Sequence, residues 1–281
     1  MQMQTNMNNI LGDEIVEKIA AVLITLALLL VTTTARAEPA TLKTRTGNDI
    51  GLSFSSYQYQ EPGLMSLKGM KMGLDLRTTK ALRNDHFMRG ELRYAFGSVD
   101  YNSNSTGSAS GEQDWYIEAR GLVGKDWAIN DAALSAYTGV GYRYLFNDGR
   151  GITSTGNWGY RRESSYFYLP IGIIHSSSLN DQARLVGTLE YDHLLAGKQI
   201  SRLSDGGQGH SDITNNQTSG HGLKLSVMYE RNKWAIGPYA HFWNIGRSET
   251  AFLYQNGILV GMGWEPKNDT VEFGLKASQQ F

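Results

Sequence analysis

The sequence "VEFGLKASQQF" at residues 271–281 contains the pattern that decides the fold. Apolar residues alternate with polar or small ones along it, and Phe281 is the last residue. Successive side chains of a β-strand point to opposite sides of the chain. The stretch therefore predicts a strand with two different faces, one formed by Val271, Phe273, Leu275 and Ala277 and the other by Glu272, Gly274, Lys276, Ser278 and Gln280.

Composition narrows the class of protein. The 281 residues carry a formal net charge of −1, which gives no reason to expect nucleic acid as a partner. The absence of cysteine excludes a disulfide framework and a thiolate metal site. Thirty-two glycines, fifteen tyrosines and six tryptophans against five prolines are typical of a chain rich in β-strands.

The first 37 residues have the features of an export signal. An uninterrupted apolar block, "IAAVLITLALLLV" at 19–31, follows Lys18, and "ARA" at 35–37 matches a small-x-small cleavage pattern. We therefore predict a cleaved signal peptide over 1–37 and a single exported domain over 38–281. After residue 37, no apolar run approaches the roughly 20 residues that a membrane-spanning helix needs.

Ten segments of the exported part alternate like the last one, over about the length of a tilted membrane strand. Pro170 and Pro238 make the sixth and ninth segments the weakest assignments, because proline cannot donate to a β-ladder. The segments lie at 48–60, 66–79, 87–100, 114–125, 133–146, 164–175, 182–195, 221–231, 234–246 and 270–281.

Charge is confined to one face of these segments. The other face is apolar, as in Ile50, Leu52 and Phe54 of the first segment. In a closed barrel the charged face would line the lumen, and opposite charges would have to pair there. The charged positions are Lys71, Asp75, Arg77, Arg89, Glu91, Arg93, Glu118, Arg120, Arg143, Arg184, Glu190, Asp192, Lys224, Glu230, Glu272 and Lys276.

The connections between segments alternate in length. Links near 80–86, 126–132, 176–181 and 231–233 are short, whereas 101–113, 147–163, 196–220 and 247–269 are long and polar. Only 61–65 is tight on the long side. This asymmetry is typical of a transmembrane barrel with long loops outside and both termini in the periplasm.

Aromatic residues at the predicted strand ends support the same arrangement, because such rings favour the membrane interface. Phe87, Trp127, Trp234 and Phe281 are expected at the inner rim, and Trp115 and Trp243 at the outer rim. The alternative, a soluble sandwich whose polar face meets water, does not account for these rims or for the loop asymmetry. In lipid, by contrast, strands must close so that no edge stays unpaired.

The chain resembles the small outer-membrane β-barrel proteins, the broad opacity-protein and OmpA-like transmembrane class. The features that carry the resemblance are the signal peptide, the alternation, the loop asymmetry and the final "EFGLKASQQF" with Phe281. It implies an all-β, closed, antiparallel up-and-down transmembrane barrel in the cell outer membrane. Its implied partners are outer-membrane lipid, lipopolysaccharide and the barrel-assembly machinery, which would recognise the strand ending in Phe281.

We predict about ten strands. Eight or twelve remain alternatives, because "GILVGMGW" at 257–264 could form an additional strand.

The charged lumen leads us to expect a structural or narrow passive-channel role, porin-like, without cofactor or metal. In one interpretation, paired charges plug the barrel and fix the strand register. In the other, Arg89, Arg93 and Arg120 favour anions in a weakly selective channel.

Two other functions are weighed against this one. Long loops with Trp158, Tyr160, Phe252, Leu253, Tyr254 and Trp264 could form a recognition or adhesin surface for an unknown extracellular ligand. An outer-membrane lipid- or peptide-modifying enzyme is the third hypothesis, with Asp192, His193, His210, Asp212, His221 and His241 as candidates.

We expect no enzyme. Asp192 and His193 are adjacent, so they face opposite sides of a strand, and the Asp-x-His pair of outer-membrane aspartyl proteases is absent from the sequence.

Overall fold

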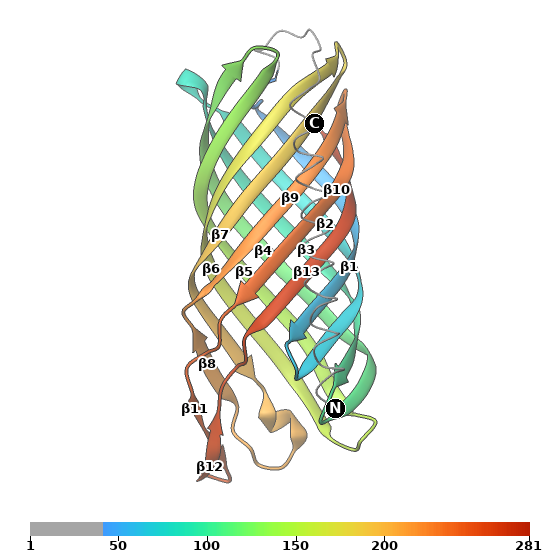
Figure 1. Cartoon of the computed structure of the whole chain (residues 1–281), viewed down its shortest axis with the longest axis vertical. Coiled ribbons are helices and arrows are strands. Elements are labelled where there is room, and N and C mark those ends of the chain that lie inside the picture. The colour runs from blue at the N-terminus through green and yellow to red at the C-terminus, as the bar shows by residue number, and fades with distance from the viewer. Residues whose placement is uncertain (1–41) are drawn as a thin grey trace.

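The computed structural model describes residues 42–281, which form ten long antiparallel strands closed into a barrel (Figure 1). The predicted signal peptide at 1–37 lies outside the described residues. The barrel strands are β1 (Gly47–Glu61), β2 (Met65–Ala81), β3 (His86–Ser103), β4 (Gly107–Ile129), β5 (Ala132–Ile152), β6 (Trp158–Asn180), β7 (Ala183–Ser201), β9 (Gly220–Arg231), β10 (Trp234–Ile245) and β13 (Asn268–Gln280).

All ten predicted strands are confirmed, and neighbours in the sequence are neighbours in the barrel. The strand at the C-terminus closes the ring by pairing with β10 on one side and with β1 on the other, for example Phe54 opposite Leu275. The backbones approach closely there, since a Cβ at Gly274 would lie 2.4 Å from the carbonyl oxygen of Phe54. Closure leaves no free edge in the barrel wall.

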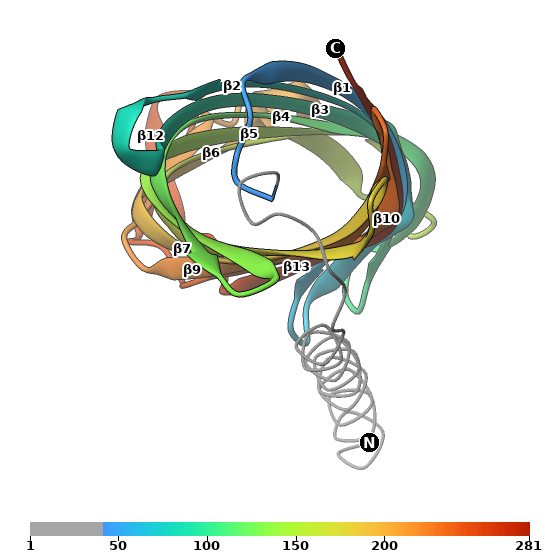
Figure 2. The ribbon, with the colours of Figure 1, turned by 90° about the horizontal axis from the view of Figure 1, so that it is seen from above.

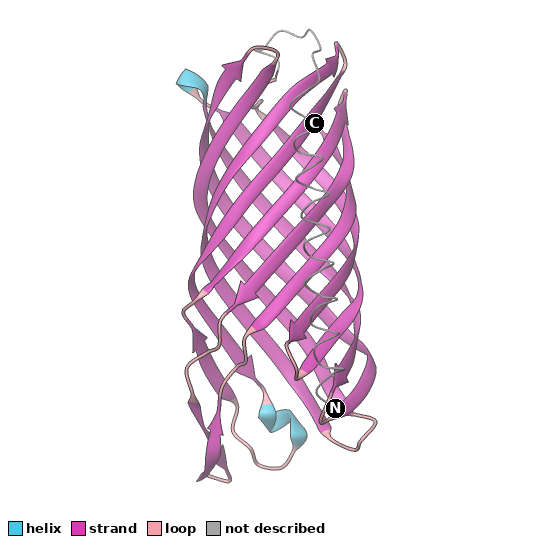
Figure 3. Ribbon diagram, viewed as in Figure 1, coloured by secondary structure: helices cyan, strands magenta, loops and turns pink. Residues whose placement is uncertain are grey.

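The two ends of the barrel differ (Figure 3). We call the end that carries Gly47 and Gln280 the terminal end, which is at the top of Figure 1, and the opposite end the distal end. At the terminal end the turns are short, and Asn130 and Asn232 occupy them with positive φ angles of 50° and 57°. Asparagine tolerates this left-handed conformation better than most residues do.

Three short strands lie at the distal end, outside the barrel ring. β8 (Ile213–Gln217) extends the sheet beside β7, whereas β11 (Ala251–Gln255) and β12 (Ile258–Gly263) form a separate hairpin that projects from the barrel (Figure 1). Two 3-10 helices, η3 (Arg83–Asp85) and η4 (Leu203–Gly206), occupy turns. The stretch 257–264 therefore does form a strand, but outside the ring, and the barrel keeps ten strands.

Two predicted long loops are wrong. The structure replaces 101–113 by a three-residue turn between β3 and β4, and it replaces 147–163 by a five-residue turn between β5 and β6. Far from the membrane both faces of a strand meet water, so the apolar alternation disappears while backbone groups still need ladder partners. These glycine-rich, polar stretches therefore form strand extensions that the alternation did not predict. In one of them, Asn102 pairs with Ser108.

The outward face of the barrel is an apolar belt. Leu52, Phe54 and Leu275 expose 66%, 56% and 61% of their surface, and comparable side chains occur on every barrel strand. Exposure of so much apolar surface is unfavourable in water and favourable against hydrocarbon. Among residues 42–281, no helix is long and apolar enough to cross a membrane.

Substitution of Leu52 by arginine tests the belt. Leu52 is central among the outward positions of β1, between Ile50 and Phe54, where a charge would be buried in hydrocarbon. We expect Leu52→Arg to lower the free energy of unfolding in phospholipid vesicles by about 2–4 kcal/mol. The measurement is the urea midpoint of reversible folding, followed by tryptophan fluorescence. Ser105→Arg, in the exposed distal turn between β3 and β4, is the control, and equal midpoints for the two variants would contradict the lipid-facing assignment.

Candidate functional site

The lumen is the candidate functional site, because charged side chains from most of the barrel strands meet there. The sixteen charged residues that the sequence assigned to the lumen all occupy inward-facing positions of their strands. Fifteen of them form an ion pair within 4.0 Å of a group of opposite charge, and Arg143 is the exception. Charge is therefore gathered inside the barrel, where it must be compensated locally.

A set of residues that we call the central layer surrounds the fully buried Glu272. Arg93 Nη2 donates to Glu272 Oε1 at 2.6 Å, and the Tyr116 and Tyr239 hydroxyls donate to the same carboxylate at 2.6 and 2.7 Å. Ser55 Oγ adds a fourth hydrogen bond at 3.0 Å. A carboxylate without water requires this many donors, because an unpaired buried charge costs far more than a surface one.

Arg93 connects the central layer to a second carboxylate. Its Nη1 donates to both carboxylate oxygens of Asp75, at 3.0 and 2.9 Å, and Lys276 Nζ lies 3.0 Å from Asp75 Oδ1. The planar guanidinium can hold two carboxylates at once, which an ammonium group does less well. This single side chain therefore links β2, β3 and β13 across the lumen.

Lys224 is the centre of a second cluster. Its Nζ lies 2.9 Å from Glu118 and 3.5 Å from both Glu190 and Asp192. Arg120 bridges Glu190 and Glu91. Among residues 42–281, both side-chain oxygens of Asp192 lack a hydrogen-bond partner, so this carboxylate is held by its ion pair with Lys224 and its hydrogen bonding is incomplete.

Arg143 is buried, and it has no ion pair among residues 42–281. Only 1% of its surface is exposed, and its Nε and Nη1 atoms lack hydrogen-bond partners. The guanidinium lies over the Tyr116 ring, 4.0 Å from the centroid, and 5.9 Å from the centroid of a Trp243 ring. Aromatic faces partly compensate a cation that cannot reach a carboxylate.

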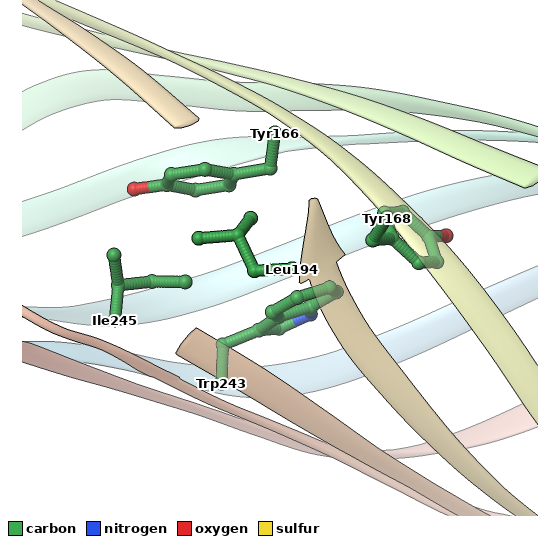
Figure 4. Close-up of a cluster of buried hydrophobic side chains, with 5 residues drawn as sticks. All are labelled: Tyr166, Tyr168, Leu194, Trp243 and Ile245. Atoms are coloured by element: carbon green, nitrogen blue, oxygen red, sulfur yellow. The ribbon is translucent and has the colours of Figure 1, made fainter. Parts of the chain in front are cut away.

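Aromatic and aliphatic side chains fill the lumen on the distal side of these charges. Tyr166, Tyr168, Leu194, Trp243 and Ile245 form one buried cluster, drawn in Figure 4. The Tyr168 and Trp243 rings meet edge to face with their centroids 5.1 Å apart. A second buried cluster contains Tyr57, Met65, Leu67 and Val99. The distal half of the lumen is thus packed like a protein core.

Inside the lumen, the remaining space lies mostly on the terminal side. Two adjoining cavities of about 140 and 110 Å³ share Arg77, Arg89 and Glu230 among their walls. Another cavity, of about 30 Å³, is lined by residues of both aromatic clusters and shares no wall residue with the first two cavities. The water-accessible space on the terminal side therefore does not continue into the distal half.

Several residues of the network were not predicted from the sequence, and two of them, Asp114 and Tyr116, lie on β4. Asp114 pairs with the buried Lys71, and Tyr116 donates to Glu272. Both share the inward-facing parity of Glu118 and Arg120 on β4. Extending the strict alternation toward the start of that predicted strand would have found them.

The predicted interface aromatics separate into two groups. Trp127, Trp234 and Phe281 are exposed at 43%, 59% and 66%, and Trp115 stacks outside the barrel against Phe146. Phe87 and Trp243 were assigned wrongly: they are 1% and 4% exposed and face the lumen. Their positions in the alternation determine which way they face. Phe87 is two residues from the inward-facing Arg89, and Trp243 lies on the face opposite to that of the outward-facing Trp234.

The histidine and aspartate candidates do not converge. Asp192 is buried in the lumen, whereas its neighbour His193 faces outward beside His221 and Tyr191. Asp212 accepts hydrogen bonds from Ser204 and Arg202 near η4. Among residues 42–281, no group of three or more His, Cys, Asp or Glu side chains is arranged to hold a metal ion.

A smaller buried cluster lies at the distal rim. The Tyr59 hydroxyl is 3.1 Å from Glu61 Oε1 and 3.0 Å from Glu265 Oε1, and Arg162 Nη1 is 3.4 Å from Glu61. Burial and the adjacent Glu61 carboxylate raise the pKa of Glu265 to about 7, against the opposing effect of Arg162. One hydroxyl proton cannot serve both carboxylates, so a protonated Glu265 completes the hydrogen bonds.

No protein-family model matches the sequence, and no curated protein matches it. Among solved structures, the barrel is similar to the outer-membrane protease OmpT from Escherichia coli, with a TM-score of 0.59 and 11% identity, over 89% of this chain and 100% of that one. It also matches the translocator domain of the autotransporter NalP from Neisseria meningitidis, with a TM-score of 0.39 and 10% identity over 95% and 96% of the two chains. A third match is Ail, the attachment invasion locus protein of Yersinia pestis, with a TM-score of 0.30 and 10% identity over 85% and 100%.

At these identities the similarity to OmpT shows the fold alone. The chain has the fold of the small outer-membrane β-barrels, as the sequence resemblance predicted.

Glu265 makes stability depend on pH. Between the ordinary pKa of 4.5 and about 7, the folded state holds the proton and the unfolded state does not, so stability falls as pH rises through this window. We expect a loss of roughly 3 kcal/mol, measured as the unfolding midpoint in vesicles from pH 4.5 to 8. The loss should be reduced in Glu265→Gln.

The control is Glu249→Gln, at an exposed position of the same connection between β10 and β13. A pH profile of Glu265→Gln that matched the wild-type profile would remove Glu265 as the cause.

Proposed function

We propose that this protein is an integral protein of the cell outer membrane with a structural role and a lumen that is closed at rest. The apolar belt supports the location, since it surrounds the barrel with side chains suited to hydrocarbon. Exported residues 38–281, released from a signal peptide over 1–37, would make up the mature barrel. Outer-membrane lipid and lipopolysaccharide would then be its surroundings, and the barrel-assembly machinery would recognise its strand ending in Phe281.

The central layer is the observation that carries this proposal. Glu272 and its donors come from β1, β3, β4, β10 and β13, so they tie strands on different sides of the lumen together. On the distal side, the cluster of Tyr166, Tyr168 and Trp243 adds a second seal. A conducting pore would require both seals to move. The narrow channel weighed for this sequence is therefore less well supported than a plug.

We assign no reaction to the barrel. OmpT is a protease with a similar fold, but a shared fold does not imply a shared activity. The Asp192 and His193 side chains lie on opposite sides of the barrel wall, where they cannot act on one substrate.

Planar-bilayer recording tests the closed lumen. We expect folded wild-type protein to give no steps of constant amplitude, because the lumen is packed. The variant Arg93→Ala/Trp243→Ala/Glu272→Ala removes the ion pair of the central layer and one large side chain of the distal cluster. It should allow ions to leak through the barrel. This variant removes both charges of the pair together, so neither is left buried alone.

The matched control is Asp148→Ala/Arg150→Ala/Trp158→Ala. It likewise replaces an ion pair and a tryptophan by alanine, but at the distal end, where Trp158 is 55% exposed. It should remain silent. Folding of each sample is checked by heat-modifiable gel mobility, and regular unitary steps from the wild type would refute a closed lumen.

A second candidate function is recognition by the projecting hairpin β11–β12. Phe252, Ile258, Met262 and Trp264 expose 58%, 69%, 62% and 49% of their surface there. Clustered exposed apolar side chains beyond a membrane are typical of binding surfaces. Arg247 stacks on the Trp264 ring at 4.3 Å, which holds that ring in place at the base of the hairpin.

Cell binding tests the recognition function. We expect protein in nanodiscs to bind fixed epithelial cells, and Phe252→Ser/Met262→Ser/Trp264→Ser to reduce binding roughly tenfold or more. Flow cytometry gives the readout. The control, Leu64→Ser/Ile152→Ser/Trp158→Ser, changes three exposed apolar residues elsewhere at the distal end. Unaltered binding by the hairpin variant would eliminate this role.

A further inference from the structure

The cavity at the mouth of the terminal end has more basic than acidic residues in its wall. This cavity, which we call the mouth cavity, has a volume of about 110 Å³, enough for several waters or one small polyatomic ion. Its acidic wall residues are Asp49 and Glu230 only. Its basic wall residues are Lys43, Arg45, Arg77, Arg89, Arg184 and Lys233.

Local pairing cancels part of this positive charge, since Lys43 Nζ lies 2.9 Å from Asp85 Oδ1. Glu230 is paired with Arg184, whose Nη2 lies 2.6 Å from Glu230 Oε2. Arg77 lies 3.2 Å from Glu91, but the same carboxylate also pairs with Arg120. Glu91, which lines the adjoining cavity, thus pairs with several guanidinium groups, and it neutralises only one positive charge.

Arg89 is the cation with the poorest compensation. Its side chain is 11% exposed, and its closest carboxylate, Glu91, is 4.0 Å from Nη1. Its Nε donates to Thr79 Oγ1 at 3.2 Å, and its guanidinium lies 5.2 Å from the centroid of the Phe87 ring. Within residues 42–281, neither terminal nitrogen of Arg89 has an acceptor at hydrogen-bond distance. A largely buried guanidinium with unused donors at a cavity wall can hold one side of an anion.

The N-terminal segment of the described chain adds to this mouth. Residues 42–46 bend into the barrel opening, as seen from above in Figure 2. The Thr44 backbone N–H and hydroxyl donate to Asp126 at 2.9 and 3.0 Å, and Leu42 is buried. This anchoring brings Lys43 and Arg45 to the cavity wall, opposite the barrel arginines.

We propose that the mouth cavity binds a small oxyanion of the phosphate type, with the Arg89 guanidinium as its main donor. A planar guanidinium presents two parallel N–H groups that match two oxygens of one oxyanion. Arg77 supplies further positive charge around it. The ligand would enter from the terminal side, since the lumen is packed toward the distal end.

Isothermal titration with inorganic phosphate tests the site. The folded chain in neutral detergent micelles at pH 7 and low ionic strength should bind one phosphate saturably. Arg89→Gln should weaken the affinity at least tenfold, because the paired donors are lost. Arg89→Lys should also weaken it, since an ammonium keeps the charge but lacks the fork. Heat-modifiable mobility shows that each variant is folded, so a loss of binding is not a loss of structure.

Arg150→Gln is the matched control, because it removes an exposed arginine at the distal end. Its phosphate affinity should equal that of the wild type. Sodium chloride at the same ionic strength gives the background. Absence of saturable binding, equal affinity in Arg89→Gln, or full competition by equimolar chloride would each overturn the assignment of an oxyanion site.

Discussion

A carboxylate held away from water, Glu272, is the constraint on which the interior depends. It accepts hydrogen bonds from Arg93, Tyr116, Tyr239 and Ser55, which lie far apart in the sequence. These donors reach it only when the strands close in one register, since a shift by one residue would turn every side chain to the other face. Compensation of buried charge therefore both selects the register and fills the lumen. A barrel lined in this way is specified by its interior as much as by its apolar surface.

The outside of the barrel follows a different rule. Within hydrocarbon, each backbone N–H and C=O needs a partner inside the protein, and a ring of strands supplies one for every position. The pairing of β13 with β1 completes that ring. Beyond the belt the same ladders continue into water, as β5 and β6 show with lengths of 21 and 23 residues. The distal extension is thus continuous with the membrane wall, and it positions the hairpin β11–β12 outside.

The number and approximate positions of the barrel strands were predictable from the sequence, and the errors have physical causes. The ten alternating segments correspond to ten barrel strands because one face meets an apolar environment and the other a charged one. The loops at 101–113 and 147–163 were misread because alternation weakens where both faces are hydrated. Phe87 and Trp243 were misplaced because their aromatic type was given more weight than their parity. In the candidate site, the inward positions followed from the alternation along each strand. The incomplete hydrogen bonding of Arg143 and Asp192 could not be recognised from a list of charges.

By itself, the sequence determined which side chains share a face, because alternation along a strand is a local property of the extended backbone. That was sufficient for an all-β barrel with an apolar outside and a charged inside. Only the tertiary structure decided which charges meet, because ion pairs such as Arg93 with Glu272 join residues 179 positions apart. It also decided that the distal lumen is packed and that the terminal mouth keeps a cavity with more basic than acidic residues in its wall. Both depend on how side chains of ten strands share one enclosed volume, which no single strand encodes.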